Sequence, residues 1–211
     1  MSVIGTGAAA LRTVLEAASR CLTGVTPASA LPDLPGPALF IANHRSHLDQ
    51  LLVRAALPKR LRRTLRPVAG KDYWGRGAVR RVLAERVFQA LLISRRPMCR
   101  RDHPVARLAD ALDAGQSLLL FPEGTRNRTA EPLLPFKPGL AHLIKARPHT
   151  PVVPVWIENQ QLVLPKGACL PVPLLCRVGL GAPLFAHAGE AKRAFLARCQ
   201  SALLETKEQM A

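Results

Sequence analysis

The 211-residue chain is poor in acidic and in aromatic residues. Thirty Lys and Arg stand against 14 Asp and Glu, giving a net charge of +16, and aromatic residues make up only 4% of the sequence. This surplus of positive charge predicts an anionic partner: nucleic acid, a phospholipid surface or a polyanionic cofactor.

The basic residues are concentrated between Arg54 and Arg107, where 16 Lys and Arg accompany only Asp72, Glu85 and Asp102. Single-strand nucleic-acid binders interleave aromatic and basic residues, and the only aromatic residues in this segment are Tyr73, Trp74 and Phe88. The segment has no recognised finger, ribbon or RNA-binding signature. We therefore expect no nucleic acid, which leaves a phospholipid surface or a polyanionic cofactor as the anionic partner.

Paired cysteines and long apolar runs are missing as well. The five cysteines are odd in number and form no Cys-x-x-Cys pair, which favours free thiols in a reducing compartment. No stretch reaches the roughly 20 uncharged apolar residues of a spanning helix, and the N-terminus lacks the order of a signal peptide. These absences predict a cytosolic chain that does not span a membrane.

Strand-like and helix-like segments alternate along most of the chain. Strands are expected at 38–42, 67–69, 91–94, 117–121, 152–157 and 176–180, and helices at 46–57, 76–90, 103–115, 138–147 and 189–208. This alternation predicts a single α/β domain with a largely parallel or mixed sheet flanked by helices. The Pro- and Leu-rich stretch 160–175 fits neither pattern.

An amphipathic helix is expected over residues 4–22, before a Pro-rich link. Its apolar residues recur on one face, and Arg12, Glu16 and Arg20 recur on another. We divide the chain into this helix with its link, residues 1–35, and a main domain, residues 36–211. A second helix, within 76–90, carries Val79, Val82, Leu83 and Val87 beside a basic stripe, which indicates either a core-facing helix with a solvated back or a membrane-binding one.

The first candidate site follows the strand at 38–42. His44 stands at the strand end, and Asp49, five residues on, can reach back to one imidazole nitrogen and leave the other as a base. The alternative is a capping box, in which Ser46 and Asp49 only bind backbone amides at a helix start. His47 lacks the companions of a zinc motif, so no metal is expected.

The second candidate site is the polar loop Pro122 to Arg128, which ends an apolar strand. Gly124 permits close approach of the backbone, and Arg126 offers a planar guanidinium suited to phosphate. An ordinary turn with solvated arginines is the alternative.

Together these segments resemble the glycerolipid acyltransferase superfamily, typified by 1-acylglycerol-3-phosphate acyltransferases. His44 to Asp49 is similar to the family's His-x-x-x-x-Asp motif, and residues 121–126 to its Phe-Pro-Glu-Gly-Thr-Arg motif. Phe136 to Gly139 resembles the family's Phe-Lys-x-Gly, and 153–155 its Val/Ile-Pro-Val strand. A looser match runs from Gly70-Lys71-Asp72-Tyr73 to Ser94-Arg95-Arg96, where Arg95 or Arg96 takes the place of the family's arginine.

The resemblance implies an enzyme that moves a fatty acyl group from acyl-CoA or acyl-carrier protein to a hydroxyl of a lysolipid. His44 would deprotonate that hydroxyl and Asp49 would orient His44, with no acyl-enzyme and no metal or redox cofactor. The substrate-binding residues that it implies are Lys71, Arg95, Glu123, Gly124, Thr125 and Arg126. The acceptor is expected to be 1-acylglycerol-3-phosphate, with another lysophospholipid or a lyso-aminolipid as alternatives, and thioester hydrolysis as a rival reaction. Because such an acceptor resides in a bilayer, the resemblance also implies a peripheral protein on an anionic membrane surface, at the cytoplasmic face.

Overall fold

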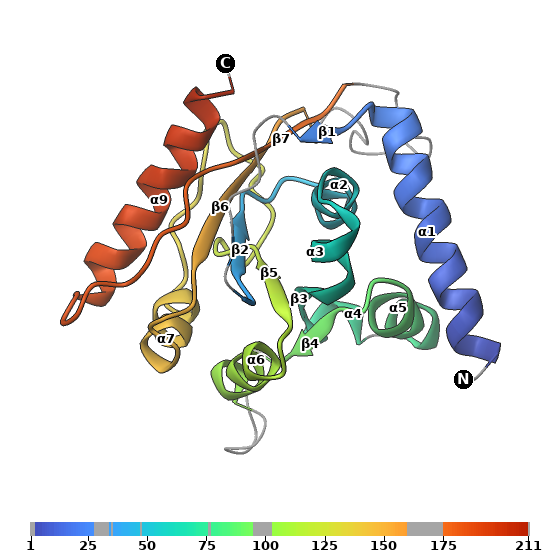
Figure 1. Cartoon of the computed structure of the whole chain (residues 1–211), viewed down its shortest axis with the longest axis horizontal. Coiled ribbons are helices and arrows are strands. Elements are labelled where there is room, and N and C mark those ends of the chain that lie inside the picture. The colour runs from blue at the N-terminus through green and yellow to red at the C-terminus, as the bar shows by residue number, and fades with distance from the viewer. Residues whose placement is uncertain are drawn as a thin grey trace.

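The computed structural model describes residues 3–27, 34, 36–46, 48–75, 77–94, 103–159 and 175–210. In these residues one sheet runs in the order β1-β7-β6-β2-β5-β3-β4 (Figure 1). The strands are β1 (Thr26–Pro27), β2 (Leu39–Ala42), β3 (Leu65–Gly70), β4 (Leu91–Ile93), β5 (Ser117–Leu120), β6 (Val152–Ile157) and β7 (Arg177–Leu180). β2 to β6 run parallel to one another, and β7 pairs antiparallel with β6.

The helices are α1 (Val3–Thr23), α2 (Asp49–Ala56), α3 (Lys59–Thr64), α4 (Lys71–Trp74), α5 (Ala78–Val82), α6 (Pro104–Asp113), α7 (Gly139–Ala146) and α9 (Lys192–Glu208), with a π-helical turn η1 at Leu83–Val87. The predicted α/β domain with a mixed sheet and an N-terminal helix is confirmed. The division of the chain at residue 35 stays a prediction, and the unplaced stretch 160–174 lies outside the described residues.

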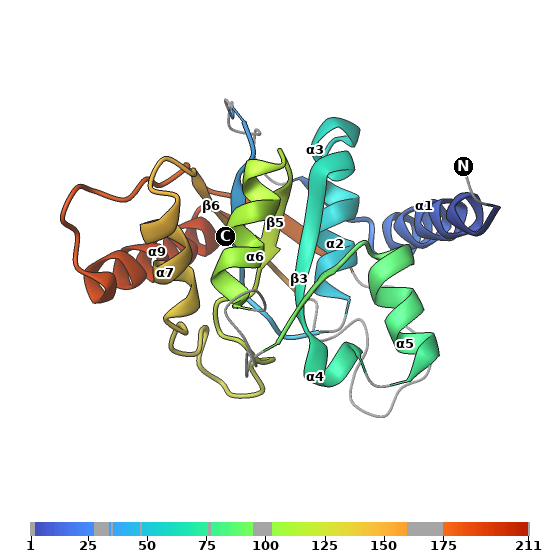
Figure 2. The same ribbon diagram turned by 90° about the horizontal axis from the view of Figure 1, so that it is seen from below.

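The centre of the sheet is buried on both faces, because β2 and β6 are apolar and buried at every position. Successive side chains of a strand point to opposite faces. Leu39 and Ile41 accordingly join one core cluster, with residues of α6, α7 and α9. Phe40 and Ala42 join the other, with residues of α2. Helices therefore cover both faces, and the ends of the parallel strands are left for polar residues (Figure 2).

Helix α1 packs outside α2 (Figure 1). Its charged side chains make hydrogen bonds to the rest of the protein. Glu16 accepts hydrogen bonds from Arg54 Nε and Arg62 Nη1, both at 2.9 Å. Arg20 Nε donates to the Ala55 carbonyl at 2.8 Å. These contacts join α1 to α2 and α3 through polar groups, of which Glu16 and Arg54 are buried.

The solvent face of α1 is consequently almost free of charge. Its exposed residues before Arg20 are Gly7, Ala10, Leu11, Thr13, Val14 and Ala17. On the neighbouring helix α5, Val79 is 74% exposed and Val82 45% exposed, whereas Val87 of η1 is buried. The core-facing interpretation of the 76–90 helix is therefore right for Val87 and wrong for Val79 and Val82. No helix within the described residues is long and apolar enough to cross a membrane.

Candidate active site

His44 follows β2 directly and is held by the carboxylate of Asp49. The His44 Nδ1 to Asp49 Oδ2 distance is 2.8 Å, and Asp49 is fully buried. Because an ionised carboxylate only accepts hydrogen bonds, Nδ1 carries the proton and Nε2 keeps its lone pair. Within the described part of the chain, Nε2 has no hydrogen-bond partner, so it is available as a base.

Asp49 also serves the start of α2. Its Oδ2 accepts hydrogen bonds from the backbone N–H groups of Arg45, at 2.8 Å, and Ser46, at 3.0 Å. The Ser46 hydroxyl in turn accepts the N–H of Leu48 at 3.3 Å. The Ser46–Asp49 hydrogen bond of the predicted capping box is present, but it lies in the turn before α2, whose N-cap residue is Leu48 and has no side-chain cap hydrogen bond. The same carboxylate oxygen binds both this turn and His44.

The loop after β5 holds the backbone of His44 through hydrogen bonds. Glu123 Oε1 accepts the backbone N–H of His44 at 2.8 Å, and Oε2 accepts that of Leu134 at 2.8 Å. Asn127 donates its backbone N–H to the His44 carbonyl at 2.6 Å. Burial raises the pKa of Glu123, and its two amide hydrogen bonds oppose that rise. Glu123 therefore links the backbone at His44 to the backbone at Leu134.

Two further contacts fix the shape of this loop. Gly124 has a φ of +69°, and a Cβ there would lie 3.1 Å from Lys137 Cγ, so a side chain would be both strained and crowded. The ring of Phe121 stacks on the His44 imidazole with 4.2 Å between centroids. The imidazole is thus held by a hydrogen bond at its edge and by an aromatic face.

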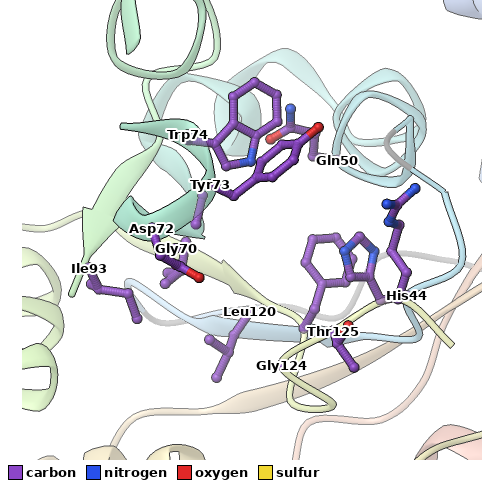
Figure 3. A pocket seen from close by; sticks show the side chains of 14 residues that line it. His44, Gln50, Gly70, Asp72, Tyr73, Trp74, Ile93, Leu120, Gly124 and Thr125 are labelled. Carbon is purple, nitrogen blue, oxygen red and sulfur yellow. The ribbon is translucent and has the colours of Figure 1, made fainter. Parts of the chain in front are cut away.

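A cavity of about 360 Å³ opens in front of His44, where β2, β3, β4 and β5 end (Figure 3). Its walls include His44, Gly124, Thr125 and Arg126, from the two candidate segments. Pockets at the carboxyl ends of parallel strands are the usual ligand sites of α/β sheets. The topology thus unites the two motifs, which lie about 80 residues apart, around one space.

The other predicted substrate-binding residues are not among the residues that line the described cavity. Glu123 is buried behind the loop and does not line the cavity. Lys71 is exposed at the start of α4 and is likewise not among the described lining residues. Arg95 and Arg96 lie outside the described residues, as does His47.

Comparison with known proteins shows which family the chain is related to. The Acyltransferase family model matches residues 24–158, more than half of the chain. The chain belongs to the acyltransferase family. The resemblance expected from the two motifs is thereby confirmed.

Curated relatives of this family member match it over shorter regions. The 1-acyl-sn-glycerol-3-phosphate acyltransferase of Limnanthes douglasii is 45% identical over 60 residues, which is 28% of this chain and 21% of that protein. The protein of the same name from Cocos nucifera is 27% identical over 139 residues, which is 62% of this chain and 40% of that protein. The chain therefore spans well under two thirds of the length of either relative.

The crystal structure of the 1-acyl-sn-glycerophosphate (LPA) acyltransferase PlsC from Thermotoga maritima has the same fold. The superposition has a TM-score of 0.71 and covers 95% of this chain and 80% of that one, with 19% sequence identity. At this identity the likeness concerns the fold.

Sequence reasoning did not name most of the residues that line the cavity as site residues, and three polar or aromatic ones are among those missed. Gln50 directly follows Asp49 in α2, and Tyr73 and Trp74 lie in α4. The one available signal was the adjacent pair of aromatic residues in a chain with so few. Gln50 carried no signal, because it continues an ordinary helical pattern.

Metal and thiol chemistry find no support in the described residues. No group of three or more His, Cys, Asp or Glu there could hold a metal ion. Burial raises the pKa of Cys176 to about 11 and that of Cys199 to about 12, so both remain thiols at neutral pH. The described site therefore has its basic group in His44 and not in a thiolate.

Proposed function

We propose that this chain transfers a fatty acyl group from the thioester of acyl-CoA or acyl-carrier protein to the free hydroxyl of 1-acylglycerol-3-phosphate. The observation that carries the proposal is the His44–Asp49 pair, whose free Nε2 stands at a cavity also lined by Arg126. The family membership and the names of the curated relatives support it. Other lysophospholipids and lyso-aminolipids present the same hydroxyl and are the alternative acceptors.

In the proposed reaction, His44 Nε2 accepts the proton of the acceptor hydroxyl as its oxygen attacks the thioester carbonyl. Asp49 keeps the imidazole in the required tautomer and stabilises the imidazolium. The C–S bond then breaks, the new ester forms, and the proton leaves His44 for the departing sulfur. The nucleophile comes from the acceptor, so no acyl-enzyme is needed and no resident cofactor takes part.

Arg126 is the proposed ligand of the acceptor's phosphate. It is half-buried in the wall of the cavity, and no described residue forms a hydrogen bond or ion pair with it. A guanidinium can bind phosphate through two parallel N–H groups, which also fixes the orientation of the acceptor. Thr125 and Gly124 lie beside it in the same loop and would line the path of the phosphate.

A membrane partner is proposed from the uncharged side of α1 and the exposed valines of α5. We call this surface the α1–α5 face and define it by Leu11, Val14, Val79 and Val82. α1 packs against η1, which continues α5, and the ribbon views place α1 and α5 side by side (Figures 1 and 2). Exposed arginines accompany it at Arg80, Arg81 and Arg86.

The α1–α5 face also adjoins the cavity. Tyr73 lines the cavity, is 43% exposed and has the Arg80 guanidinium 5.1 Å from its ring centroid. Each basic residue near an anionic leaflet contributes about 1 kcal/mol of binding. We propose that this face rests on the anionic, cytoplasmic surface of a membrane, where a lysolipid acceptor resides.

A transfer assay tests the proposed reaction. Labelled oleoyl-CoA and oleoyl-carrier protein are each offered with 1-oleoylglycerol-3-phosphate, with other lysophospholipids, with a lyso-aminolipid, and without acceptor. The expected product is labelled phosphatidic acid, with one thiol released per ester formed. Labelled free fatty acid formed at a rate independent of the acceptor would identify a thioesterase and contradict the proposal.

A further inference from the structure

Gln50 is buried in the wall of the cavity and has no hydrogen-bond partner among the described residues. It is 9% exposed and belongs to α2, one residue after Asp49. Eleven polar or charged residues of the described chain are buried, and in ten of them the side chain makes a hydrogen bond: Glu16, Thr23, Asn43, Ser46, Asp49, Arg54, Ser117, Glu123, Asn127 and Thr206. Gln50 is the exception, since its carboxamide has no partner among the described residues.

A carboxamide cut off from both water and protein partners destabilises a fold. The Gln50 amide is not enclosed in this way: the buried side-chain atoms without a partner in the described chain are Asp49 Oδ1 and Arg62 Nε, and Gln50 lines the cavity. The side chain therefore offers a free N–H₂ donor and a free carbonyl acceptor to whatever occupies this space.

The position of Gln50 separates it from the proposed phosphate end of the cavity. Figure 3 shows Gln50, Tyr73 and Trp74 on one side of the cavity, and Gly124 and Thr125 on the other, beside His44. In a direct transfer both substrates meet at His44. If the loop of Thr125 and Arg126 holds the acceptor, the side of Gln50 is left for the acyl donor.

The donor has a group that matches a carboxamide. Coenzyme A and acyl-carrier protein both present the thioester on a pantetheine arm, which contains two secondary amides close to the sulfur. Each amide offers one N–H and one C=O, so a glutamine side chain can bind it with a donor and an acceptor together. The neighbouring Tyr73 and Trp74 add apolar wall for the methylene groups of the arm.

We propose that Gln50 binds an amide of the donor's pantetheine arm and thereby places the thioester carbonyl beside His44. This inference rests on the proposed function and adds a donor-binding residue to it. It also predicts that the protein distinguishes donors by the amides of the arm and not only by the acyl chain.

The test compares Gln50→Met, which keeps the length of the side chain and removes its amide, with the wild type. The matched control is Gln209→Met, at an exposed glutamine just after α9. Two donors are used, oleoyl-CoA and the oleoyl thioester of ethanethiol, which lacks both amides, with saturating 1-oleoylglycerol-3-phosphate in detergent. Thermal melting checks the fold, and Gln50→Asn, whose amide is withdrawn by one methylene, is made in parallel.

Loss of one or two neutral hydrogen bonds should raise the KM for oleoyl-CoA about five- to tenfold in Gln50→Met and in Gln50→Asn. The kcat/KM for the ethanethiol thioester and the KM for the acceptor should stay as in the wild type, and Gln209→Met should change none of them. Equal losses with both donors, or a rise confined to the acceptor's KM, would overturn the inference while leaving the proposed function intact. Absence of transfer by the wild type would contradict the proposed function and this inference with it.

Discussion

Glu123 accepts the backbone N–H of His44 at 2.8 Å, although the two residues lie 79 positions apart. This hydrogen bond joins the His-x-x-x-x-Asp motif to the Phe-Pro-Glu-Gly-Thr-Arg loop. The catalytic geometry that we propose therefore depends on a carboxylate that faces the backbone. Glu123 acts as a positioning residue in this account.

Glu123→Gln should lower both stability and turnover. The substituted amide has one acceptor oxygen, so either the His44 or the Leu134 N–H is left unpaired in a buried place. We expect a loss of about 1–3 kcal/mol in the free energy of unfolding and a lower kcat, measured by urea denaturation and by the transfer assay. Unchanged stability with a raised KM for the acceptor alone would instead place Glu123 against the substrate.

Arg126→Ala should weaken acceptors that carry a phosphate. Charge-assisted hydrogen bonds are worth about 1.5–3 kcal/mol each, so kcat/KM for 1-oleoylglycerol-3-phosphate should fall about 10- to 100-fold. Monooleoylglycerol, which has the hydroxyl and no phosphate, should lose little. Arg128→Ala, in the same loop but exposed and away from the cavity, is the control. Equal losses for both acceptors would mean that Arg126 supports the loop.

Glu16→Gln should destabilise the protein strongly because it leaves two cations without their anion. The Glu16 side chain is 10% exposed and that of Arg54 is 3% exposed, and burial already lowers the pKa of Arg54. Breaking a buried pair in this way costs about 3–5 kcal/mol in the free energy of unfolding. Glu85→Gln removes the exposed pair with Arg81 and should cost less than about 0.5 kcal/mol. Similar urea midpoints for the two variants would contradict this role of Glu16.

The α1–α5 face is tested by vesicle cosedimentation. Val14→Asp and Val79→Asp should reduce binding to vesicles containing phosphatidylserine. Arg80→Gln should weaken binding at low salt and make the remaining binding less sensitive to added salt. Phe185→Asp is the control, since Phe185 is 46% exposed and lies by α9, across the molecule from α1 (Figure 1). Arg62 is left unchanged because it binds Glu16. Equal binding of the wild type to neutral and anionic vesicles at low salt would refute the anionic surface.

The sequence predicted the strands well because their apolar runs are buried on both faces and bounded by polar residues. It predicted that α1 has two faces, but not which face turns inward. That outcome depends on Arg54 and Arg62, more than 35 residues away, whose cationic groups draw Glu16 into the interface. The short helices α3 and α4 were missed, since six and four residues are too few for a periodic pattern.

The candidate site was predictable to a similar degree. The two motifs identified His44, Gly124, Thr125 and Arg126, which the topology then brings to one cavity. Local spacing could not show that Glu123 binds the backbone of His44, because that contact depends on the pairing of β2 with β5. The role of Gln50 could not be predicted from local spacing either, since only the fold shows that its amide has no partner among the described residues.

The most direct test of the account is the turnover of Asp49→Asn beside its melting temperature. The asparagine oxygen can still accept the Arg45 and Ser46 N–H groups, so the cap at α2 should lose at most about 1 kcal/mol. The imidazole loses its anionic partner and its fixed tautomer, so kcat should fall about 10³- to 10⁴-fold, near the level of a folded His44→Ala. A lower melting temperature with unchanged turnover would show that Asp49 only caps the helix, and would contradict the proposed mechanism.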